Sequence, residues 1–227
     1  MSIETRPTVS IVDYGLGNLF SVKHACDYAG MEATITSAAE IILSTDAVIL
    51  PGVGAFRDAM ECLIRQDLVP VLKDVVRSEK PLLGICLGMQ LLMTESQEFG
   101  ITKGLGLLDG EVLRLETSFE NGQHLKVPHV GWSPILISSN NANDQSNNPM
   151  FAGVPDGTDM YFVHSYFTKP MNRNVISSTT KYGAIEFCSS LVKDNIFGYQ
   201  FHPERSGASG LRIYENLRSQ LAPLKKD

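Results

Sequence analysis

Apolar and polar residues alternate along the first half of the chain in blocks that predict strands and helices in turn. Short apolar runs have the length of buried strands, and longer segments with an apolar residue every three or four positions have helical spacing. In chain order the predicted elements are strands at Thr8–Val12, Ala33–Thr36, Ala47–Leu50 and Leu82–Ile85, and helices at Leu19–Ala29 and from Phe56 onward. This alternation predicts an α/β fold with a mostly parallel central sheet flanked by helices.

The second half of the chain is richer in predicted strands, and we expect additional antiparallel strands there. They are predicted at Glu111–Leu115, Ile135–Ile137, Met160–Phe167, Ala184–Phe187 and Ile196–Phe201, before a final helix from Gly207 to Gln220. The segment from Asn140 to Pro149 is polar and rich in asparagine, which predicts a surface loop. With 227 residues, 43% of them hydrophobic, the chain is compatible with a single domain spanning 1–227.

A cysteine lies where the fourth predicted strand turns into a helix. Gly84 and Gly88 stand two residues before and two after Cys86, which is the spacing of a nucleophile elbow. The unpaired N–H groups and positive dipole end of a helix favour a thiolate at this position. Cys86 is therefore a candidate nucleophile, whereas the three other cysteines lack flanking glycines and are typical of small buried hydrophobic residues.

A histidine and a glutamate at the end of the last predicted strand offer the partners that such a nucleophile needs. Pro203 prevents the strand from continuing past His202. The imidazole can take and return a proton near neutral pH, and Glu204 can fix its tautomer. Alone, this motif could equally be a surface turn, but with Cys86 it completes a nucleophile, a base and an orienting carboxylate.

A glycine-containing loop follows the third predicted strand. Backbone N–H groups of Gly52 and Val53 could point at a developing oxyanion, with the Leu87 N–H as a second donor. A plain strand-to-helix turn that uses glycine for conformational freedom is the alternative. Gln90 lies one helical turn past Cys86 and therefore on the same face of the helix.

Six motifs occur in an order and spacing that specify more than any one of them does alone. They are Asp13–Asn18, Pro51–Phe56, Gly84–Leu92, Pro128–Trp132, Tyr161–Tyr166 and Gln200–Ser206. Together they resemble the class I (triad) glutamine amidotransferases, most closely the glutaminase subunits of imidazole glycerol phosphate synthases, from about Ser10 to Leu217. The resemblance implies hydrolysis of glutamine to glutamate and ammonia without a cofactor. Ammonia would pass to a (β/α)8 cyclase/synthase subunit in a heterodimer that forms imidazole glycerol phosphate and AICAR in histidine biosynthesis.

The resemblance also implies the catalytic roles. Cys86 would form the γ-glutamyl thioester, His202 would act as general acid and base, and Glu204 would orient His202. The loop and turn donors described above would form the oxyanion hole.

Substrate-binding roles follow from the resemblance in the same way. Gln90 and Glu98 would hold the α-amino and carboxylate end of glutamine, and Ser165 and Tyr166 would clamp the same end through their backbone. Only Gln90 has independent support, from its helical spacing. The other three assignments rest wholly on the resemblance.

The face that meets the synthase would, by the same resemblance, include Leu16, Asn18, Trp132, Tyr161 and Arg205. A lone tryptophan is more often buried packing, which is the alternative for Trp132. Arg205 stands where the family usually has lysine. The glycines on either side of Leu16 also begin a dinucleotide-binding pattern, but Phe20 occupies the place of its third glycine.

Composition narrows the remaining function classes. A formal charge of −6 argues against a nucleic-acid or anionic-membrane partner. No apolar stretch reaches the ~18 residues of a membrane span, and Met1 to Arg6 lacks the apolar core of a signal peptide. Four unclustered cysteines are typical of reduced thiols and not of disulfides or a zinc site. We therefore expect a cytoplasmic enzyme with no bound metal.

Three alternative functions stay open at this point. A stand-alone cysteine hydrolase or peptidase would be fully active by itself. A catalytically silent binding subunit is disfavoured by the intact Cys86, His202 and Glu204. A paralogue that supplies ammonia for amidino groups on bacterial surface sugars remains compatible with the Asn140–Pro149 segment and with Arg205.

Overall fold

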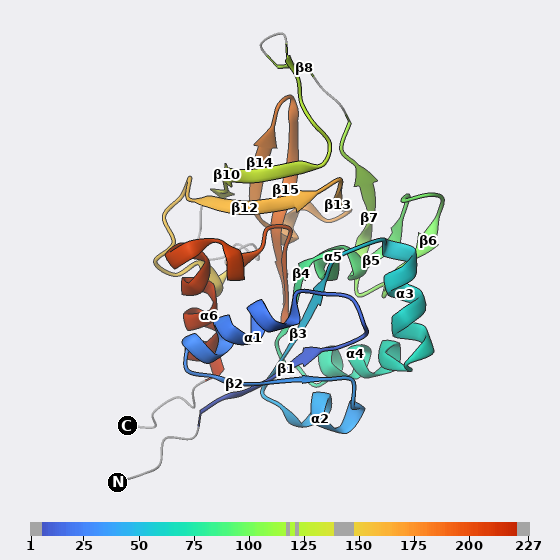
Figure 1. The fold of residues 1–227 in the computed structure, drawn as a ribbon, viewed down its shortest axis with the longest axis vertical. Coiled ribbons are helices and arrows are strands. Elements are labelled where there is room, and N and C mark those ends of the chain that lie inside the picture. The colour runs from blue at the N-terminus through green and yellow to red at the C-terminus, as the bar shows by residue number, and fades with distance from the viewer. Residues whose placement is uncertain (1–5, 117–118, 121–122, 139–147, 222–227) are drawn as a thin grey trace.

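A sheet of eight strands runs through the molecule (Figure 1). The computed structural model describes residues 6–116, 119–120, 123–138 and 148–221. Five neighbouring strands are parallel, in the order β2 (Glu32–Thr36), β1 (Thr8–Val12), β3 (Ala47–Gly52), β4 (Leu82–Cys86) and β16 (Ile196–Tyr199). The antiparallel strands β15 (Ile185–Lys193), β14 (Ile176–Tyr182) and β11 (Leu136–Ile137) follow. This confirms the predicted mostly parallel sheet with antiparallel additions.

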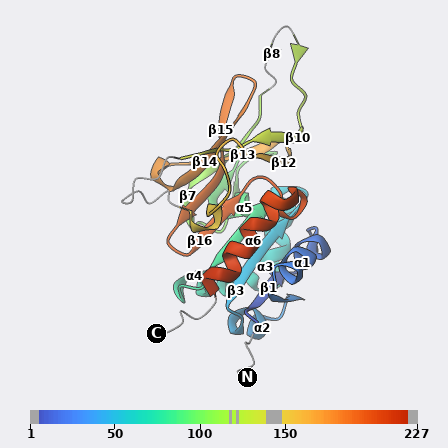
Figure 2. The ribbon, with the colours of Figure 1, turned by 90° about the vertical axis from the view of Figure 1, so that its left-hand side faces the viewer.

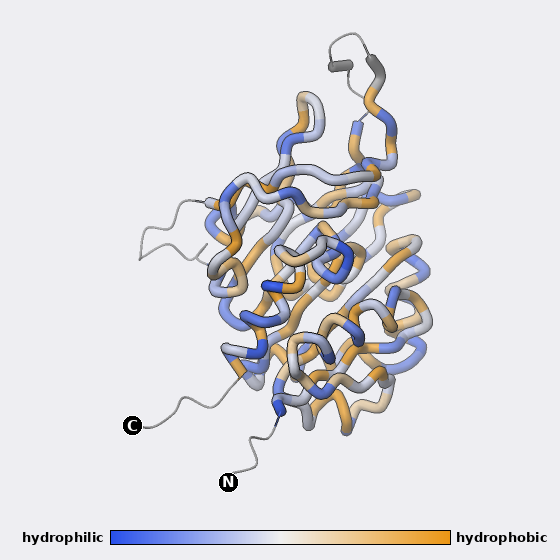
Figure 3. Tube along the Cα trace, turned by 60° about the vertical axis from the view of Figure 1, so that its left-hand side comes forward, coloured by the Kyte–Doolittle hydropathy of each residue, from blue (hydrophilic) through white to orange (hydrophobic). Residues whose placement is uncertain are grey.

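Helices cover both faces of the parallel part. On one face lie α1 (Leu19–Tyr28) and α6 (Gly207–Leu221), and on the other α2 (Ala39–Ser44), α3 (Phe56–Arg65), α4 (Leu68–Arg77) and the short α5 (Leu87–Leu91). Alternate residues of each strand enter different cores: Ile11 packs with α1 and α6, whereas Val12 packs with α2, α3 and α4. Figure 2 shows α6 crossing the sheet with α1 beside it. Apolar and polar residues alternate along the helices in Figure 3, as expected for helices with one apolar face.

Smaller sheets are added at the end of the parallel strands where α5 begins. One contains β13 (Tyr166–Pro170), β7 (Leu108–Arg114), β5 (Met93–Ser96) and β6 (Thr102–Lys103). Another pairs β10 (His129–Pro134) with β12 (Asp159–His164), and a hairpin is formed by β8 (Phe119–Glu120) and β9 (Gln123–His124). Short 3-10 turns are η1 (Pro149–Phe151), η2 (Arg173–Val175) and η3 (Pro203–Arg205). Among the described residues, no helix combines the length and apolar character that crossing a membrane requires.

The predicted strand Met160–Phe167 is two strands. It breaks at Ser165, so that β12 pairs with β10 while β13 pairs with β7 in a different sheet. The alternation of side chains continues across the break without a glycine or proline to mark it, which is why the apolar pattern alone suggests one strand. The break places Ser165 between two sheets.

Most of the predicted Asn140–Pro149 loop lies outside the described residues. At its end, however, Asn148 is buried, and its side-chain nitrogen lies 3.3 Å from the Ser177 hydroxyl and 3.4 Å from that of Tyr199. Asn148 also caps η1 by accepting from the Met150 N–H. The prediction of a surface loop is therefore wrong for this residue, because partners distant in sequence satisfy its amide.

Candidate active site

The backbone at Cys86 forms a sharp turn between β4 and α5. Cys86 has φ 54° and ψ −109°, a conformation that residues with a Cβ rarely adopt. A Cβ on Gly84 would lie 2.8 Å from backbone atoms of Gly88, and a Cβ on Gly88 would overlap the carbonyl oxygen of Leu50. Both glycines are therefore required for the chain to pass, and the turn has the geometry of a nucleophile elbow.

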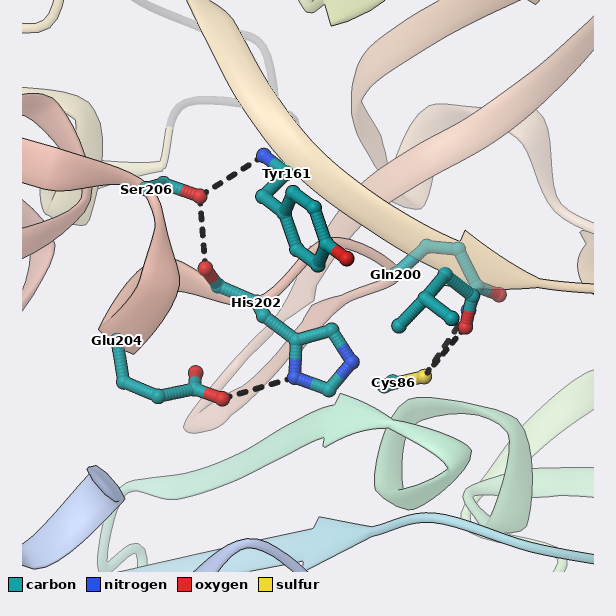
Figure 4. A network of polar contacts seen from close by, with 7 residues as sticks. Cys86, Tyr161, Gln200, His202, Glu204 and Ser206 are labelled. Carbon is teal, nitrogen blue, oxygen red and sulfur yellow. Dashed lines mark hydrogen bonds and ion pairs between the residues drawn. The ribbon is translucent and has the colours of Figure 1, made fainter. Parts of the chain in front are cut away.

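His202 and Glu204 form a buried pair just beyond β16. The Nδ1 atom of His202 is 2.8 Å from Oε1 of Glu204, with side chains 5% and 1% exposed. In Figure 4 the opposite edge of the ring points toward Cys86, and its Nε2 has no hydrogen-bond partner among the described residues. Burial lowers the pKa of His202, but the neighbouring Cys86 and Glu204 outweigh it and raise the pKa above its ordinary value. A proton transferred from the sulfur to this ring is thereby stabilised.

Strand β12 and the η3 turn fix the backbone of His202. Its N–H donates to the carbonyl oxygen of Tyr161 at 2.9 Å. The Ser206 hydroxyl donates to the His202 carbonyl oxygen at 2.7 Å and accepts from the Tyr161 N–H at 3.0 Å (Figure 4). Two segments distant in sequence from each other thus hold the histidine in place.

The loop after β3 lies against the elbow. Gly52 is in register with Cys86, and a Cβ at Gly52 would lie 2.9 Å from the Cβ of Leu87. The Tyr14 hydroxyl, held neutral because burial raises its pKa, donates to the Pro51 carbonyl oxygen at 2.8 Å. Tyr14, which follows β1, therefore anchors the backbone at the start of this loop.

Cys86 opens into a pocket of about 730 Å³. The predicted site residues that line it are Val53, Leu87, Gln90, Glu98, Ser165 and Tyr166. They come from the loop after β3, from α5, from the segment after β5 and from the break between β12 and β13. The fold thus brings the predicted nucleophile and the predicted substrate-binding residues together in one cavity.

Comparisons with known proteins agree with this geometry. The family model described as "Glutamine amidotransferase class-I" matches residues 10–217. Imidazole glycerol phosphate synthase subunit HisH of Geobacter sulfurreducens is 46% identical over 210 residues, which cover 92% of this chain and 97% of that protein. The HisH subunit of Methanosarcina mazei is 46% identical over 211 residues, covering 92% and 96%. The chain belongs to the class-I glutamine amidotransferases, in the HisH family.

Solved structures agree at the level of the fold. The structure of PurLQS from Thermotoga maritima has a TM-score of 0.72 with 19% identity and covers 96% of this chain and 100% of that chain. A glutamine amidotransferase from Thermotoga maritima has a TM-score of 0.58 with 17% identity, covering 98% and 87%. These structures support the fold, and the family model and the HisH relatives confirm the resemblance drawn from the six motifs.

Gln90 in this amidotransferase is held so that one polar group stays available. Its side-chain nitrogen donates to the Tyr166 carbonyl oxygen at 2.9 Å and to Oε1 of Gln200 at 3.1 Å. Both amide hydrogens are thus used within the protein. The carbonyl oxygen of Gln90, which has no donor among the described residues, is left to accept from a ligand.

Glu98 joins the pocket to the helix that follows the glycine loop. One carboxylate oxygen accepts from the Phe56 N–H at 2.6 Å, at the first residue of α3. A carboxylate is favoured at a helix N-terminus. Its second oxygen remains for a ligand in the pocket, so Glu98 can hold a cation and the start of α3 together.

Three residues of the predicted partner face form an aromatic and cationic stack. Trp132 and Tyr161 meet edge to face with ring centroids 5.9 Å apart, and the Arg205 guanidinium lies 4.7 Å from the Tyr161 centroid. Trp132 is 56% exposed, so the alternative that it is buried packing is wrong. Leu16 and Asn18 lie in the connection between β1 and α1, on either side of Gly17, whose Cβ would be 3.5 Å from Pro51.

The sequence analysis assigns no role to Gln200, which the structure places beside the candidate nucleophile Cys86. It is fully buried, and its Nε2 lies 3.8 Å from the Cys86 sulfur while its Oε1 accepts from Gln90. A polar glutamine at the end of an apolar strand could have indicated such a role, because a buried amide requires hydrogen-bond partners. The sequence analysis also assigns no role to Tyr14, although it includes this residue in the Asp13–Asn18 motif.

Proposed function

We propose that this amidotransferase is the glutaminase subunit of an imidazole glycerol phosphate synthase and hydrolyses glutamine through Cys86, His202 and Glu204. The observation that carries the proposal is the strained cysteine at a helix start, facing a buried histidine–carboxylate pair and opening into a pocket with Gln90 and Glu98. The names of its relatives support the choice of synthase.

In the proposed reaction, His202 Nε2 takes the proton of the Cys86 thiol as the sulfur attacks the side-chain amide carbon of glutamine. The C–S bond forms, and the oxyanion accepts hydrogen bonds from backbone N–H groups of the Gly52–Val53 loop and of Leu87. When the intermediate collapses, the C–N bond breaks and His202 protonates the departing ammonia. The product of this half-reaction is a γ-glutamyl thioester on Cys86.

The second half-reaction uses the same groups. His202 removes a proton from water, the resulting C–O bond replaces the C–S bond, and the proton returns to sulfur as glutamate leaves. Glu204 stays ionised and orients the imidazole throughout.

Substrate orientation would come from the far end of the pocket. The free carbonyl oxygen of Gln90 and the second carboxylate oxygen of Glu98 would accept from the α-ammonium group of glutamine. The backbone at Ser165 and Tyr166 would bind the α-carboxylate. In this orientation the side-chain amide of glutamine would lie at Cys86.

The ammonia would be delivered to a (β/α)8 cyclase subunit bound in a heterodimer, for imidazole glycerol phosphate and AICAR formation in histidine biosynthesis. The stack of the exposed Trp132 and Arg205 with the half-buried Tyr161, together with Leu16 and Asn18, would form the docking face. Exposed aromatic and arginine side chains of this kind are enriched at interfaces.

The decisive experiment purifies the chain with its co-purifying partner and measures glutamate release with and without that partner and its ligand. We expect a cyclase-type barrel partner, slow turnover alone, strong stimulation in the complex, and complete loss of activity in Cys86→Ala with partner binding kept. Cys188→Ala, which removes a buried thiol elsewhere, is the matched control. Retained activity in Cys86→Ala would refute the mechanism.

The partner's identity and the activity of the isolated chain separate this function from its competitors. A partner that builds amidino groups on sugars would replace histidine biosynthesis as the pathway. Full activity from the chain alone would indicate a stand-alone hydrolase and refute the coupling.

A further inference from the structure

Two buried histidines outside the triad lie side by side next to the pocket. His129 on β10 and His164 at the end of β12 are 2% and 6% exposed, and they are directly opposite each other in the strand pair. Aromatic rings enclose them: His129 stacks between Phe162 and Tyr182, with centroids 5.0 and 4.1 Å away. Apolar enclosure disfavours a charged imidazole, so both rings are expected to be neutral.

Their hydrogen bonds form a chain that can run in only one direction. The Nδ1 atom of His164 is 2.9 Å from the Tyr166 carbonyl oxygen, which can only accept, so Nδ1 carries the hydrogen. In a neutral ring Nε2 of His164 must then accept, and it does so from Nδ1 of His129 at 3.2 Å. Nε2 of His129 in turn accepts from the Ser133 hydroxyl at 2.9 Å.

This series of hydrogen bonds ends on a carbonyl oxygen that also holds a proposed substrate-binding residue. The Tyr166 carbonyl oxygen accepts from His164 on one side and from the side chain of Gln90, also at 2.9 Å, on the other. Both donors together fix the backbone beside Ser165, where the chain passes from β12 to β13. The orientation of Gln90 therefore depends on a carbonyl that His164 holds in place.

We propose that His129 and His164 are positioning residues that form a neutral, one-directional hydrogen-bond relay from Ser133 to the Tyr166 carbonyl and thereby set the glutamine-binding end of the pocket. The relay begins on β10, one residue after Trp132, and so links the strand of the docking face to the substrate site. Burial lowers the pKa of His129 to about 4 and that of His164 to about 3, which agrees with neutral rings. The inference rests on the proposed glutamine pocket.

The test compares two substitutions at His164, one that keeps the donor and one that keeps the ring. An asparagine nitrogen reaches about as far as Nδ1, so His164→Asn can still donate to Tyr166, whereas His164→Phe keeps a ring and loses the donor. We expect His164→Phe to raise KM for glutamine about fivefold to tenfold with a smaller change in kcat, and His164→Asn to stay within about twofold of the parent. Equal KM values for the two variants would overturn the proposal.

His129 offers an equivalent pair if His164→Phe fails to fold. His129→Asn keeps a donor toward His164, whereas His129→Gln reaches toward Ser133 and loses that donor. KM should rise only in His129→Gln. Tyr182→Phe, which keeps the stacked ring and removes the hydroxyl bonded to Lys126, is the control and should behave like the parent.

A second readout does not require turnover. Histidine nitrogen NMR of the full chain should show both rings neutral with the hydrogen on Nδ1 between about pH 6 and pH 8. A hydrogen on Nε2 of either ring, or a charged ring in that range, would refute the relay. If the parent hydrolyses no glutamine, the proposed function fails, and this spectrum still judges the relay separately.

Discussion

The Arg205 guanidinium lies over the ring of Tyr161, 4.7 Å from its centroid, and the carbonyl oxygen of the same tyrosine accepts from the His202 N–H. One residue therefore contacts the proposed docking face with its side chain and the proposed catalytic base with its backbone. A partner that shifts the Tyr161 ring would also displace the backbone of β12, which accepts the hydrogen bond from the His202 N–H. The proposed docking face and the proposed catalytic base are thus joined through one residue.

Removing the Arg205 guanidinium should weaken partner binding without disabling the triad. The cation–π contact of Arg205 with Tyr161 is worth about 0.5 to 1 kcal/mol when exposed and about 2 kcal/mol when desolvated. Docking would strengthen it by about 1 kcal/mol, so we expect Arg205→Ala to bind about fivefold to tenfold more weakly by titration calorimetry. Arg205→Lys keeps the charge and should be affected less. Turnover of the isolated chain should not change, because backbone atoms hold His202.

The matched control is Arg212→Ala on α6, which removes another exposed arginine whose ion pair with Glu215 is local. If both alanine variants bind the partner as tightly as the parent does, Arg205 lies outside the interface.

The glycines of the elbow should be irreplaceable for steric reasons. In Gly88→Ala the new methyl group would overlap the Leu50 carbonyl oxygen, which belongs to the central sheet and cannot move aside. We expect a loss of more than about 3 kcal/mol in the free energy of unfolding, measured by denaturant titration. Gly153→Ala, with φ +75° but open space around it, should lose only about 1 to 2 kcal/mol. Similar losses in both variants would contradict the clash.

The parts of this fold and site that the sequence predicts are those with local causes. Strand β1 is predicted to the residue because its apolar run is covered on both faces, and Cys86 is recognisable because two glycines flank it. The break at Ser165 has no local marker. Its cause is the separate pairing of β12 and β13 with strands far away in the chain.

The same distinction applies to polar residues. The Gln200 side chain and Nε2 of His164 satisfy their buried groups with partners distant in sequence, so their immediate neighbours do not indicate these contacts. Glu98 looks like an exposed acidic residue, and only the fold brings it to the first N–H of α3. Tertiary partners of this kind require either the structure or a family resemblance.

Acid should destabilise the folded chain through the two enclosed histidines. Their folded pKa values are lowered to about 4 and about 3, mainly by burial and, for His164, also by the charges of His129 and His202. The unfolded chain, with pKa near 6.5, binds more protons below that pH, so stability is lost as pH falls from about 6.5 to about 4. Keeping each histidine neutral lowers the free energy of unfolding by about 2 kcal/mol at about pH 5 relative to neutral pH.

Carboxylates titrate in the same range, so the measurement compares the parent with His129→Asn and His164→Asn. Denaturant titrations at about pH 7 and about pH 5 should show a smaller loss in each variant, because asparagine does not titrate. Equal losses in all three proteins would mean that these histidines are protonated in the folded state.

Glu98 allows the charge of the pocket to be separated from its hydrogen bond to α3. Glu98→Gln keeps an oxygen that can accept from the Phe56 N–H but loses the negative charge that would meet the α-ammonium group of glutamine. We expect KM for glutamine to rise about tenfold or more, with the free energy of unfolding nearly unchanged. Glu98→Ala should raise KM as much and also destabilise α3, by about 1 kcal/mol, because the helix loses its cap. A parent-like KM in Glu98→Gln would show that the carboxylate serves the helix alone and that another group binds the amine.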